Sequence, residues 1–377
     1  MNQPVCDLVL CSWNHLEETK PCLESLLEAT RVPSRLFIVD NGSEPDVRAF
    51  LAAVQPRGAI KEIVVIQNEM NEGFPRAMNR GLKASAAPFV VILNNDLRFT
   101  VGWLQEMIEV ATANPHLGVI NPASNTLGNV PSKGVSLQAH ADRLRQSRAG
   151  QYTEVGMCIG FCMLVKRELF EKIGGFNEQV ERIFFEDEDF CMRAAQAGSL
   201  CVVAEGAYVY HAEHQTVRKM PEREALFARN REWCRAQWGR RLRLAWPRFS
   251  PLVPGSPELK QWLEEMIAWA RHRTYVYAYC PIPSGVTTRA IFESVGLIPH
   301  ADIHWRAIPA RLAPAAAAVW ILRRSKKRFD MIAAPSRGWS RLMQAAHWWH
   351  RAAVIPAEDP AQLKTAWKTK SRSPWSF

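Results

Sequence analysis

The chain has 377 residues, of which 47% are hydrophobic and 22% charged, so it has enough apolar material for one large or two ordinary domains and is not a disordered chain. Its net charge of +10 is unevenly distributed. From Arg240 to the end there are 22 Lys and Arg and 8 Asp and Glu (net +14), whereas residues 1–239 contain 25 Lys and Arg and 29 Asp and Glu (net −4). The sequence contains no apolar run of the ~18 residues that a membrane span needs, and its start lacks the basic region and cleavage site of a signal peptide.

The first part of the chain alternates short apolar runs with helical patterns. Strands are predicted over 5–11, 36–39, 63–66, 89–93 and 200–203, and helices over 17–29, 46–54 and 75–84, with Pro21 expected to end or restart the first helix. The near-continuous apolar character of these strands is typical of strands covered on both faces. The alternation predicts a mostly parallel α/β sheet, in which ligands bind beyond the carboxyl ends of the strands. Polar residues directly after a strand are therefore the functional candidates.

Later segments follow other patterns. Residues 122–154 lack a strong period, which predicts a long loop or lid with a short helix over 140–146. Three prolines and a glycine between 247 and 255 predict a linker. Beyond it, strands over 274–280, 330–334 and 353–356 and helices over 288–295 and 340–349 predict a smaller α/β unit. We therefore expect a first domain over 1–240, a linker and helix over 241–273, and a basic, Trp-rich α/β domain over 274–377.

The nine cysteines are odd in number, form no CxxC pair and lie mostly in apolar segments. Small buried thiols in a reducing compartment are favoured over disulfides or a zinc site. This usage predicts a cytoplasmic protein.

Three polar segments follow predicted strands. Asp40, in Val-Asp-Asn-Gly-Ser, can accept a hydrogen bond from a nucleobase or ribose, although such residues also make ordinary turns. Residues 71–81 place Gly73 where a backbone can approach phosphate, with a plain strand-to-helix loop as the favoured alternative. Asn94-Asn95-Asp96 ends a very apolar strand and offers the oxygen ligands that Mg²⁺ or Mn²⁺ prefers, an Asx turn being the alternative.

Four consecutive acids, residues 186–189, lie between aromatic residues at the start of an amphipathic helix. The helix dipole accounts for one or two acids there, but not for four in an apolar frame. Crowded like charges raise at least one pKa, which suits a general base near neutrality. His211 follows another apolar run, and a satisfied or exposed histidine is the simpler interpretation of it alone. Because carboxylates recur elsewhere in the domain, a metal-ligand role for His211 is also considered.

Taken in order, these motifs resemble the family 2 glycosyltransferases, most nearly their rhamnosyltransferase-like branch, over roughly residues 6–238. The motifs are the strand end with Ser12 and Asn14, VDNGS, NEGFPRAMNRG, ILNNDL, GFCMLVKRELFEKIGGFNE, FFEDEDFCMRAAQAG and VYH. The resemblance implies a GT-A-type fold with a mixed, mostly parallel sheet flanked by helices. It also implies a nucleotide-diphospho-sugar donor, a divalent metal (Mg or Mn) and inversion at the anomeric carbon.

The resemblance also implies residue roles. Asp187 would be the general base, with Glu186 and Asp189 in the same catalytic cluster, and Asp96 and His211 would bind the metal. The nucleotide-sugar would be bound by Ser12, Asn14, Asp40, Asn71, Gly73, Asn79, Asn94 and Asn95. Asn94 replaces the first acid of the family's DXD motif, so metal binding would depend on Asp96.

The expected activity is sugar transfer to a hydroxyl of a glycan or lipid-linked acceptor in cell-surface polysaccharide synthesis. Two alternatives stay open: a bifunctional transferase with a second C-terminal activity, and a non-catalytic nucleotide-sugar-binding protein. Residues 281–288 follow a strand and offer hydroxyls and amides to a phosphate, although a plain turn is favoured. The basic run 323–328, with Trp348 and Trp349, suits peripheral contact with the inner face of the cell membrane, and no nucleic-acid-binding motif is present.

Overall fold

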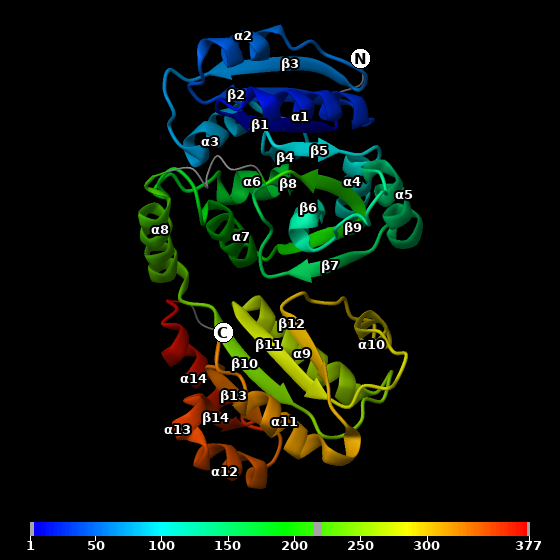
Figure 1. Cartoon of the computed structure of the whole chain (residues 1–377), viewed down its shortest axis with the longest axis vertical. Helices are drawn as coiled ribbons and strands as arrows, with labels where there is room; N and C mark the ends of the chain where they lie inside the picture. Colours follow the sequence, from blue (N-terminus) through cyan, green and yellow to red (C-terminus); the bar gives the residue numbers. More distant parts are fainter. Residues whose placement is uncertain (1–3, 214–220, 375–377) are drawn as a thin grey trace. The chain divides into compact units, whose positions relative to one another are not determined.

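The computed structural model describes residues 4–213 and 221–374, and the chain divides into two units (Figure 1). The first comprises Met1–Thr153 and Met157–Cys234, and the second comprises Glu154–Gly156 and Arg235–Phe377. Up to residue 238 the elements are β1 (Cys6–Ser12), α1 (Leu16–Ala29), β2 (Ser34–Asp40), α2 (Pro45–Ala53), β3 (Ile60–Gln67), α3 (Phe74–Ala84), β4 (Phe89–Leu93), β5 (Leu97–Phe99), α4 (Trp103–Ala113), β6 (Leu117–Ala123), η1 (Asn125–Leu127), α5 (Leu137–Arg148), β7 (Tyr152–Val155), β8 (Cys162–Lys166), α6 (Arg167–Ile173), α7 (Glu186–Gln196), β9 (Leu200–His211) and α8 (Arg223–Trp238).

In the described part of the first unit, nine strands form one sheet in the order β3-β2-β1-β4-β8-β6-β9-β5, with β7 paired to β9. Strands β1, β2, β3 and β4 are parallel, as are β6 and β9, whereas β8 runs antiparallel to both β4 and β6. Leu8, Ile38 and Ile92 are fully buried because α-helices cover the central strands. The mixed, mostly parallel sheet flanked by helices is thus confirmed.

The parallel register determines where the strand-end residues lie. Ser12 pairs with Asp40, and Leu10 pairs with Leu93 two residues before Asn95. The carboxyl ends of β1, β2 and β4 therefore meet at one edge of the sheet, as the sequence predicted.

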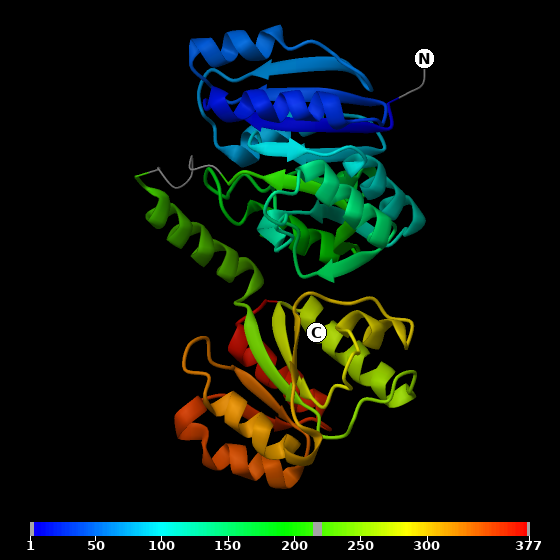
Figure 2. The same ribbon diagram turned by 45° about the vertical axis from the view of Figure 1, so that its right-hand side comes forward.

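The second unit contains β10 (Leu242–Pro247), α9 (Pro257–Arg271), β11 (Thr274–Cys280), α10 (Thr288–Glu293), β12 (Ile303–Ala307), η2 (Ala310–Leu312), α11 (Ala313–Leu322), β13 (Met331–Ala334), α12 (Arg337–Ala345), α13 (His347–His350), β14 (Ala353–Pro356) and α14 (Pro360–Ser371). Its sheet has the order β12-β11-β10-β13-β14, and every pairing is parallel. Leu244 and Leu263 of α9 belong to one buried cluster, and Ile332, Ala317 of α11 and Trp339 of α12 belong to another. Figure 2 shows the strands of this unit (light green, yellow and orange) together with its helices. The predicted smaller α/β unit is confirmed.

Several local expectations differ from the structure. Helix α1 continues through Pro21, because its apolar face (Leu23, Leu26) is buried and outweighs one lost backbone hydrogen bond. The stretch 122–154 carries the twelve-residue α5 instead of one short helix. The segment predicted as linker and helix, 241–273, holds β10 and α9, since Leu242, Leu244 and Trp246 enter the core of the second unit.

Across residues 4–213 and 221–374, none of the helices combines the length and the apolar character required to cross a membrane.

Candidate functional site

A cavity of about 520 Å³ lies in the first unit and gathers five of the predicted site residues. They are Asn94, Asp96, Glu186, Asp187 and His211. Its walls are largely aromatic, with Phe74, Phe161, Phe184, Phe185 and Phe227. Such an apolar cavity with a few converging polar groups is the usual form of a small-molecule site.

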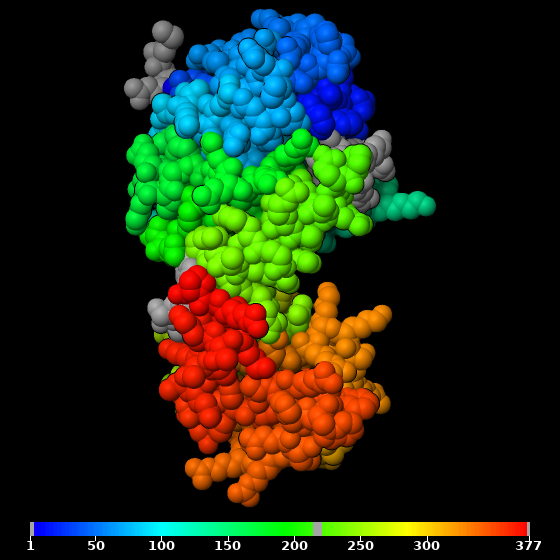
Figure 3. All heavy atoms as spheres, turned by 90° about the vertical axis from the view of Figure 1, so that its left-hand side faces the viewer, coloured from blue at the N-terminus to red at the C-terminus, as the bar shows by residue number. Residues whose placement is uncertain are grey.

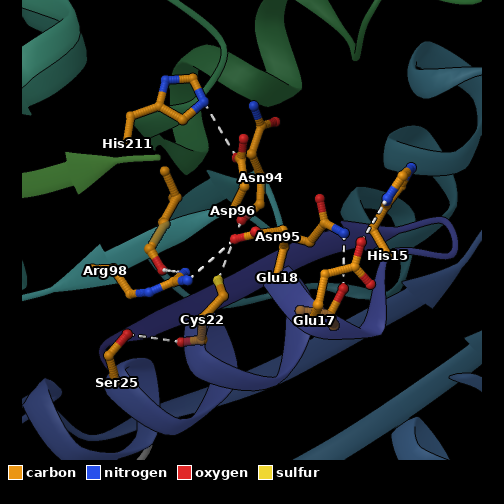
Figure 4. A network of polar contacts seen from close by, with 12 residues as sticks. His15, Glu17, Glu18, Cys22, Ser25, Asn94, Asn95, Asp96, Arg98 and His211 are labelled. Carbon is orange, nitrogen blue, oxygen red and sulfur yellow. Dashed lines mark hydrogen bonds and ion pairs between the residues drawn. The ribbon is translucent and has the colours of Figure 1, made fainter. Parts of the chain in front are cut away.

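Asp96 and His211 form a pair within this cavity. The distance from His211 Nε2 to Asp96 Oδ1 is 3.2 Å, and both side chains are 14% exposed (Figure 4). The pair is built by the backbone, because β5 and β9 are antiparallel with Leu97 opposite His211, and Ala212 N donates to Asp96 O at 3.0 Å.

The imidazole of His211 is held from two other sides. Its Nδ1 lies 3.1 Å from Thr126 Oγ1, and its ring stacks on Phe161 with centroids 5.2 Å apart and planes at 11°. The side chain of Asn125 bonds both backbone polar groups of His211, at 2.7 and 2.8 Å. The sequence reasoning assigned no role to Asn125, Thr126 or Phe161, although Asn125 and Thr126 lie in the aperiodic segment 122–154 and Phe161 lies in the motif that begins at Gly160.

Asp96 and His211 fit a divalent cation that shares its ligands with a substrate. Among the residues that the structure describes, no group of three or more His, Cys, Asp or Glu side chains is arranged to hold a metal ion. Mg²⁺ and similar cations are commonly held by one or two carboxylates, with substrate phosphates completing the shell. One carboxylate, one imidazole and the amide of Asn94 beside them suit that mode.

A strained turn directly precedes the four acids of residues 186–189. Phe184 and Phe185, just before α7, have φ of 79° and 72°, and two successive non-glycine residues with positive φ cost about 1–3 kcal/mol each. This turn aligns the start of α7 so that Glu186 and Asp187 reach the cavity, whereas Asp189 does not line it.

Asp187 is held by two backbone donors. Gly160 N donates to Oδ2 at 3.0 Å, and Glu188 N donates to Oδ1 at 2.8 Å. Burial raises the pKa of Asp187 above its usual value, and these hydrogen bonds oppose that rise. Its side chain is half-buried, while that of Glu186 is buried.

Glu186 is the more perturbed acid. Burial, followed by the charge of Asp187, raises the pKa of Glu186 to about 8, and its Oε2 has no hydrogen-bond partner among the described residues. A proton on Glu186 at neutral pH is therefore favoured, which leaves Asp187 as the carboxylate of this pair.

Asp189 supports the helix from outside the cavity. It accepts from Arg193 Nε at 2.8 Å, and Arg193 also donates to the carbonyls of Ile173 and Gly175. This ion pair attaches α7 to the loop after α6.

The strand-end residues Ser12, Asn14 and Asp40 lie together but do not line the cavity. Asp40 is fully buried, accepts from Ser43 N at 3.0 Å, and has its Oδ2 3.5 Å from Arg48 Nε. Asn14 accepts from Glu44 N at 2.8 Å, while Ser12 Oγ lies 3.3 Å from Thr19 Oγ1. These contacts shape the loops that follow β1 and β2.

Asn71 and Gly73 are also tied into the backbone. Asn71 Oδ1 accepts from Gly73 N at 2.8 Å and from Asn41 Nδ2 at 3.0 Å. Gly73 has φ of 84°, and a Cβ there would lie 2.7 Å from Arg182 Cα. Glycine is therefore needed at this position for the close approach of residue 182.

Asn79 and Asn95 form hydrogen bonds to other segments of the first unit. Asn79 donates to Phe176 O and Glu178 Oε1, each at 2.9 Å, and accepts from Phe176 N at 2.8 Å. Asn95 donates to Thr19 Oγ1 of α1 at 2.8 Å (Figure 4). Their amides hold the loop after α6 and the start of α1, and neither lines the cavity.

Comparison with known proteins identifies the family of the first unit. Residues 7–174 match the family described as Glycosyl transferase family 2. A protein of Sinorhizobium fredii without assigned function is 24% identical over 253 residues, which are 62% of this chain and 28% of that protein. The N-acetylglucosaminyl-diphospho-decaprenol L-rhamnosyltransferase of Mycobacterium tuberculosis is 28% identical over 247 residues, 57% of this chain and 78% of that enzyme.

Among solved structures, the chain is similar to a mannosyltransferase from Pyrobaculum calidifontis in complex with GDP-Man and Mn²⁺. The sequence identity is 17% and the TM-score 0.44, over 57% of this chain and 59% of that one. The match to the family ends at residue 174, so the acidic cluster and His211 lie beyond it.

Proposed function

The chain carries a glycosyl transferase family 2 domain, and from this premise we propose that it transfers a sugar from a nucleotide-diphospho-sugar to an acceptor hydroxyl, with inversion at the anomeric carbon. The observation that carries the proposal is the single cavity in which the Asp96–His211 pair and Asp187 are gathered. One end of it suits a diphosphate and the other suits proton removal.

Asp96 and His211 would hold a divalent cation at the diphosphate end, with Asn94 beside them. A bound cation neutralises charge on the leaving nucleoside diphosphate. The stacking of Phe161 and the contact of Thr126 fix the imidazole so that Nε2 points to Asp96, which limits the reorganisation needed for binding.

Asp187 would act as the base in a single displacement. The acceptor oxygen attacks the anomeric carbon, its proton passes to a carboxylate oxygen of Asp187, and the bond from carbon to the diphosphate oxygen breaks. The two backbone N–H groups keep this carboxylate oriented toward the cavity. Glu186, protonated beside it, would keep the local charge low, and Asp189 would hold the helix through Arg193.

The acceptor we propose is a lipid-linked glycan, which the name of the mycobacterial relative suggests, in surface polysaccharide synthesis on the cytoplasmic side of the membrane. The second unit supports membrane contact. Leu342 of α12 and Trp348 of α13 are 57% and 73% exposed, and α13 contacts both α12 and α11, the helix that directly precedes the basic run 323–328. This part of the chain is orange in Figure 3. Tryptophan and basic residues together favour an anionic membrane surface.

A flotation assay tests the membrane contact. The full chain should float with phosphatidylcholine vesicles that contain phosphatidylglycerol, and Trp348→Ala with Leu342→Ala should reduce the floated fraction severalfold. Val130→Ala, an equally exposed residue of the first unit, serves as control. Equal flotation of all three proteins would remove this part of the proposal.

A donor screen tests the activity itself. The full chain, with Mg²⁺ or Mn²⁺, is incubated with UDP-, dTDP- and GDP-sugars and a lipid-linked acceptor, and the released nucleoside diphosphate is measured. We expect release from one class of donor, at a rate that rises with the acceptor. Tight donor binding without release under any combination would favour the non-catalytic alternative.

A further inference from the structure

A second cavity, of about 820 Å³, lies in the C-terminal unit and has no part in the proposed transfer. It is bordered by the edge strand β12, by β11 and by the end of α11. In the register of these strands Tyr277 lies opposite His304 and Tyr279 opposite Arg306, so all four side chains project from the same face of the sheet. Thr288, of the segment 281–288, also borders it.

The lining of this cavity is strongly basic. Arg306, Arg323, Arg324 and Lys326 line it, and the lining contains no Asp or Glu. Within the described part of the chain, none of the four is within 4.0 Å of a carboxylate, whereas many other Lys and Arg side chains there are paired with an acid, such as Arg35 with Asp7 and Arg193 with Asp189. Four cations around one space without a counter-ion repel one another and attract an anion.

Arg324, one of these lining residues, is held in place by several contacts. Its guanidinium carbon lies 4.1 Å from the ring centre of Tyr277 and 4.8 Å from that of Phe329. It donates to Tyr277 Oη at 2.9 Å and to Lys327 O at 2.8 Å. A half-buried arginine that is held by aromatic rings and has no carboxylate partner presents its N–H donors in a fixed orientation to an external anion.

The positive charges of this lining also affect His304. Burial lowers the pKa of His304, and the charges of Arg324 and Arg306 lower it further, while Asp302 opposes them. The histidine is therefore neutral near pH 7 and offers a hydrogen bond without adding charge.

We propose that this cavity is a second anion-binding site, for a ligand that bears a phosphate or diphosphate group. A guanidinium group can donate two parallel hydrogen bonds to a pair of phosphoryl oxygens, and the exposed Trp320 in the lining gives the rest of such a ligand an aromatic surface. The phosphoryl group belongs either to a free molecule or to a lipid head group. This inference does not depend on the activity proposed for the first unit.

The test measures pyrophosphate binding to the full chain by titration calorimetry, with EDTA present so that metal-dependent binding at the first cavity is suppressed. Arg324→Gln and Arg306→Gln should each weaken binding about tenfold to a hundredfold, because each removes charged hydrogen bonds to the anion. Arg324→Lys should lose less, since it keeps the charge. Arg341→Gln, an exposed arginine of α12 outside the lining, is the matched control and should bind as the wild type does.

A second arm separates the two sources of phosphate, using phosphatidylcholine vesicles with and without phosphatidic acid. If the wild type binds pyrophosphate and the Arg306 and Arg324 variants do not, the result supports a free ligand. Binding only to phosphatidic acid vesicles, lost in the same variants and kept in Arg341→Gln, supports a lipid head group. The proposal is overturned if the wild type binds neither probe, or if Arg306→Gln and Arg324→Gln, folded as judged by their melting temperatures, bind both as well as the wild type does.

Discussion

Replacement of Asp187 by asparagine is the most direct test of the proposed chemistry. Asparagine keeps the shape of the side chain but cannot take up a proton, and loss of a general base typically lowers a rate by about 10²–10⁴-fold. The structure adds a second effect. Both carboxylate oxygens accept backbone N–H bonds, from Gly160 and Glu188, and asparagine has one oxygen for the two donors. One N–H is then left unmatched, which costs about 1–3 kcal/mol of folding stability.

The assay compares the rate of sugar transfer at saturating donor and acceptor for wild type and Asp187→Asn, together with donor affinity by calorimetry and urea unfolding. We expect near-normal donor affinity, a stability loss in the range given and the large drop in rate. Glu181→Gln, an exposed acid of the preceding segment outside the cavity, is the control and should change none of the three. Near-normal turnover of Asp187→Asn would refute the assignment of the base.

Three further predictions concern neighbouring residues. Asp96→Ala, and separately chelation by EDTA, should weaken donor binding at least tenfold in calorimetry, and metal-independent donor affinity and turnover would contradict the cation site. Burial raises the pKa of Glu186 from its usual 4.5 to about 8, so the neutral carboxyl stabilises the fold fully below pH 4.5 and this stability is lost as pH rises through about 8. In melting curves at pH 5 and pH 9, the melting temperature of Glu186→Gln should therefore rise relative to that of the wild type at the higher pH. Melting temperatures that change in parallel would argue against a buried neutral acid. Asn79→Ala should lower the free energy of unfolding, measured in urea, by about 1–3 kcal/mol, because the amide of Asn79 is hydrogen-bonded to Phe176 and Glu178. Its donor affinity, measured by calorimetry, should stay unchanged. Weaker donor binding with unchanged stability would instead support a role for Asn79 in binding the donor.

The sheet and part of the site were predictable from local sequence. Strand β4 and the following Asn94 to Asp96 were found because an apolar run ends in polar residues, a pattern that depends only on neighbours in the chain. The acids of α7 were found in the same way. These features need no knowledge of distant contacts.

What the sequence reasoning missed depends on contacts between distant segments. Thr126 and Phe161 approach His211 only through tertiary packing, so the motif and the loop in which they lie do not reveal this contact. Asn79 resembles a ligand in its motif, but its partners lie almost a hundred residues later. Strand β10 falls in the segment predicted as linker and helix because the prolines and the glycine between 247 and 255 begin at its last residue, Pro247. Parallel pairing on both sides places it at the centre of its sheet.

The pairing of β5 with β9 has a consequence for the newly made protein. Asp96 and His211 stand more than a hundred residues apart in the chain, and β4, with the polar residues that follow it, is synthesised long before β9. At translation rates of about 5–20 residues per second, the interval is on the order of ten seconds. During that time the nascent chain can fold its first parallel strands while its two proposed cation ligands are still separate. Under the roles proposed here for Asp96 and His211, the cation site of a ribosome-bound chain is therefore incomplete until residue 211 has left the exit tunnel.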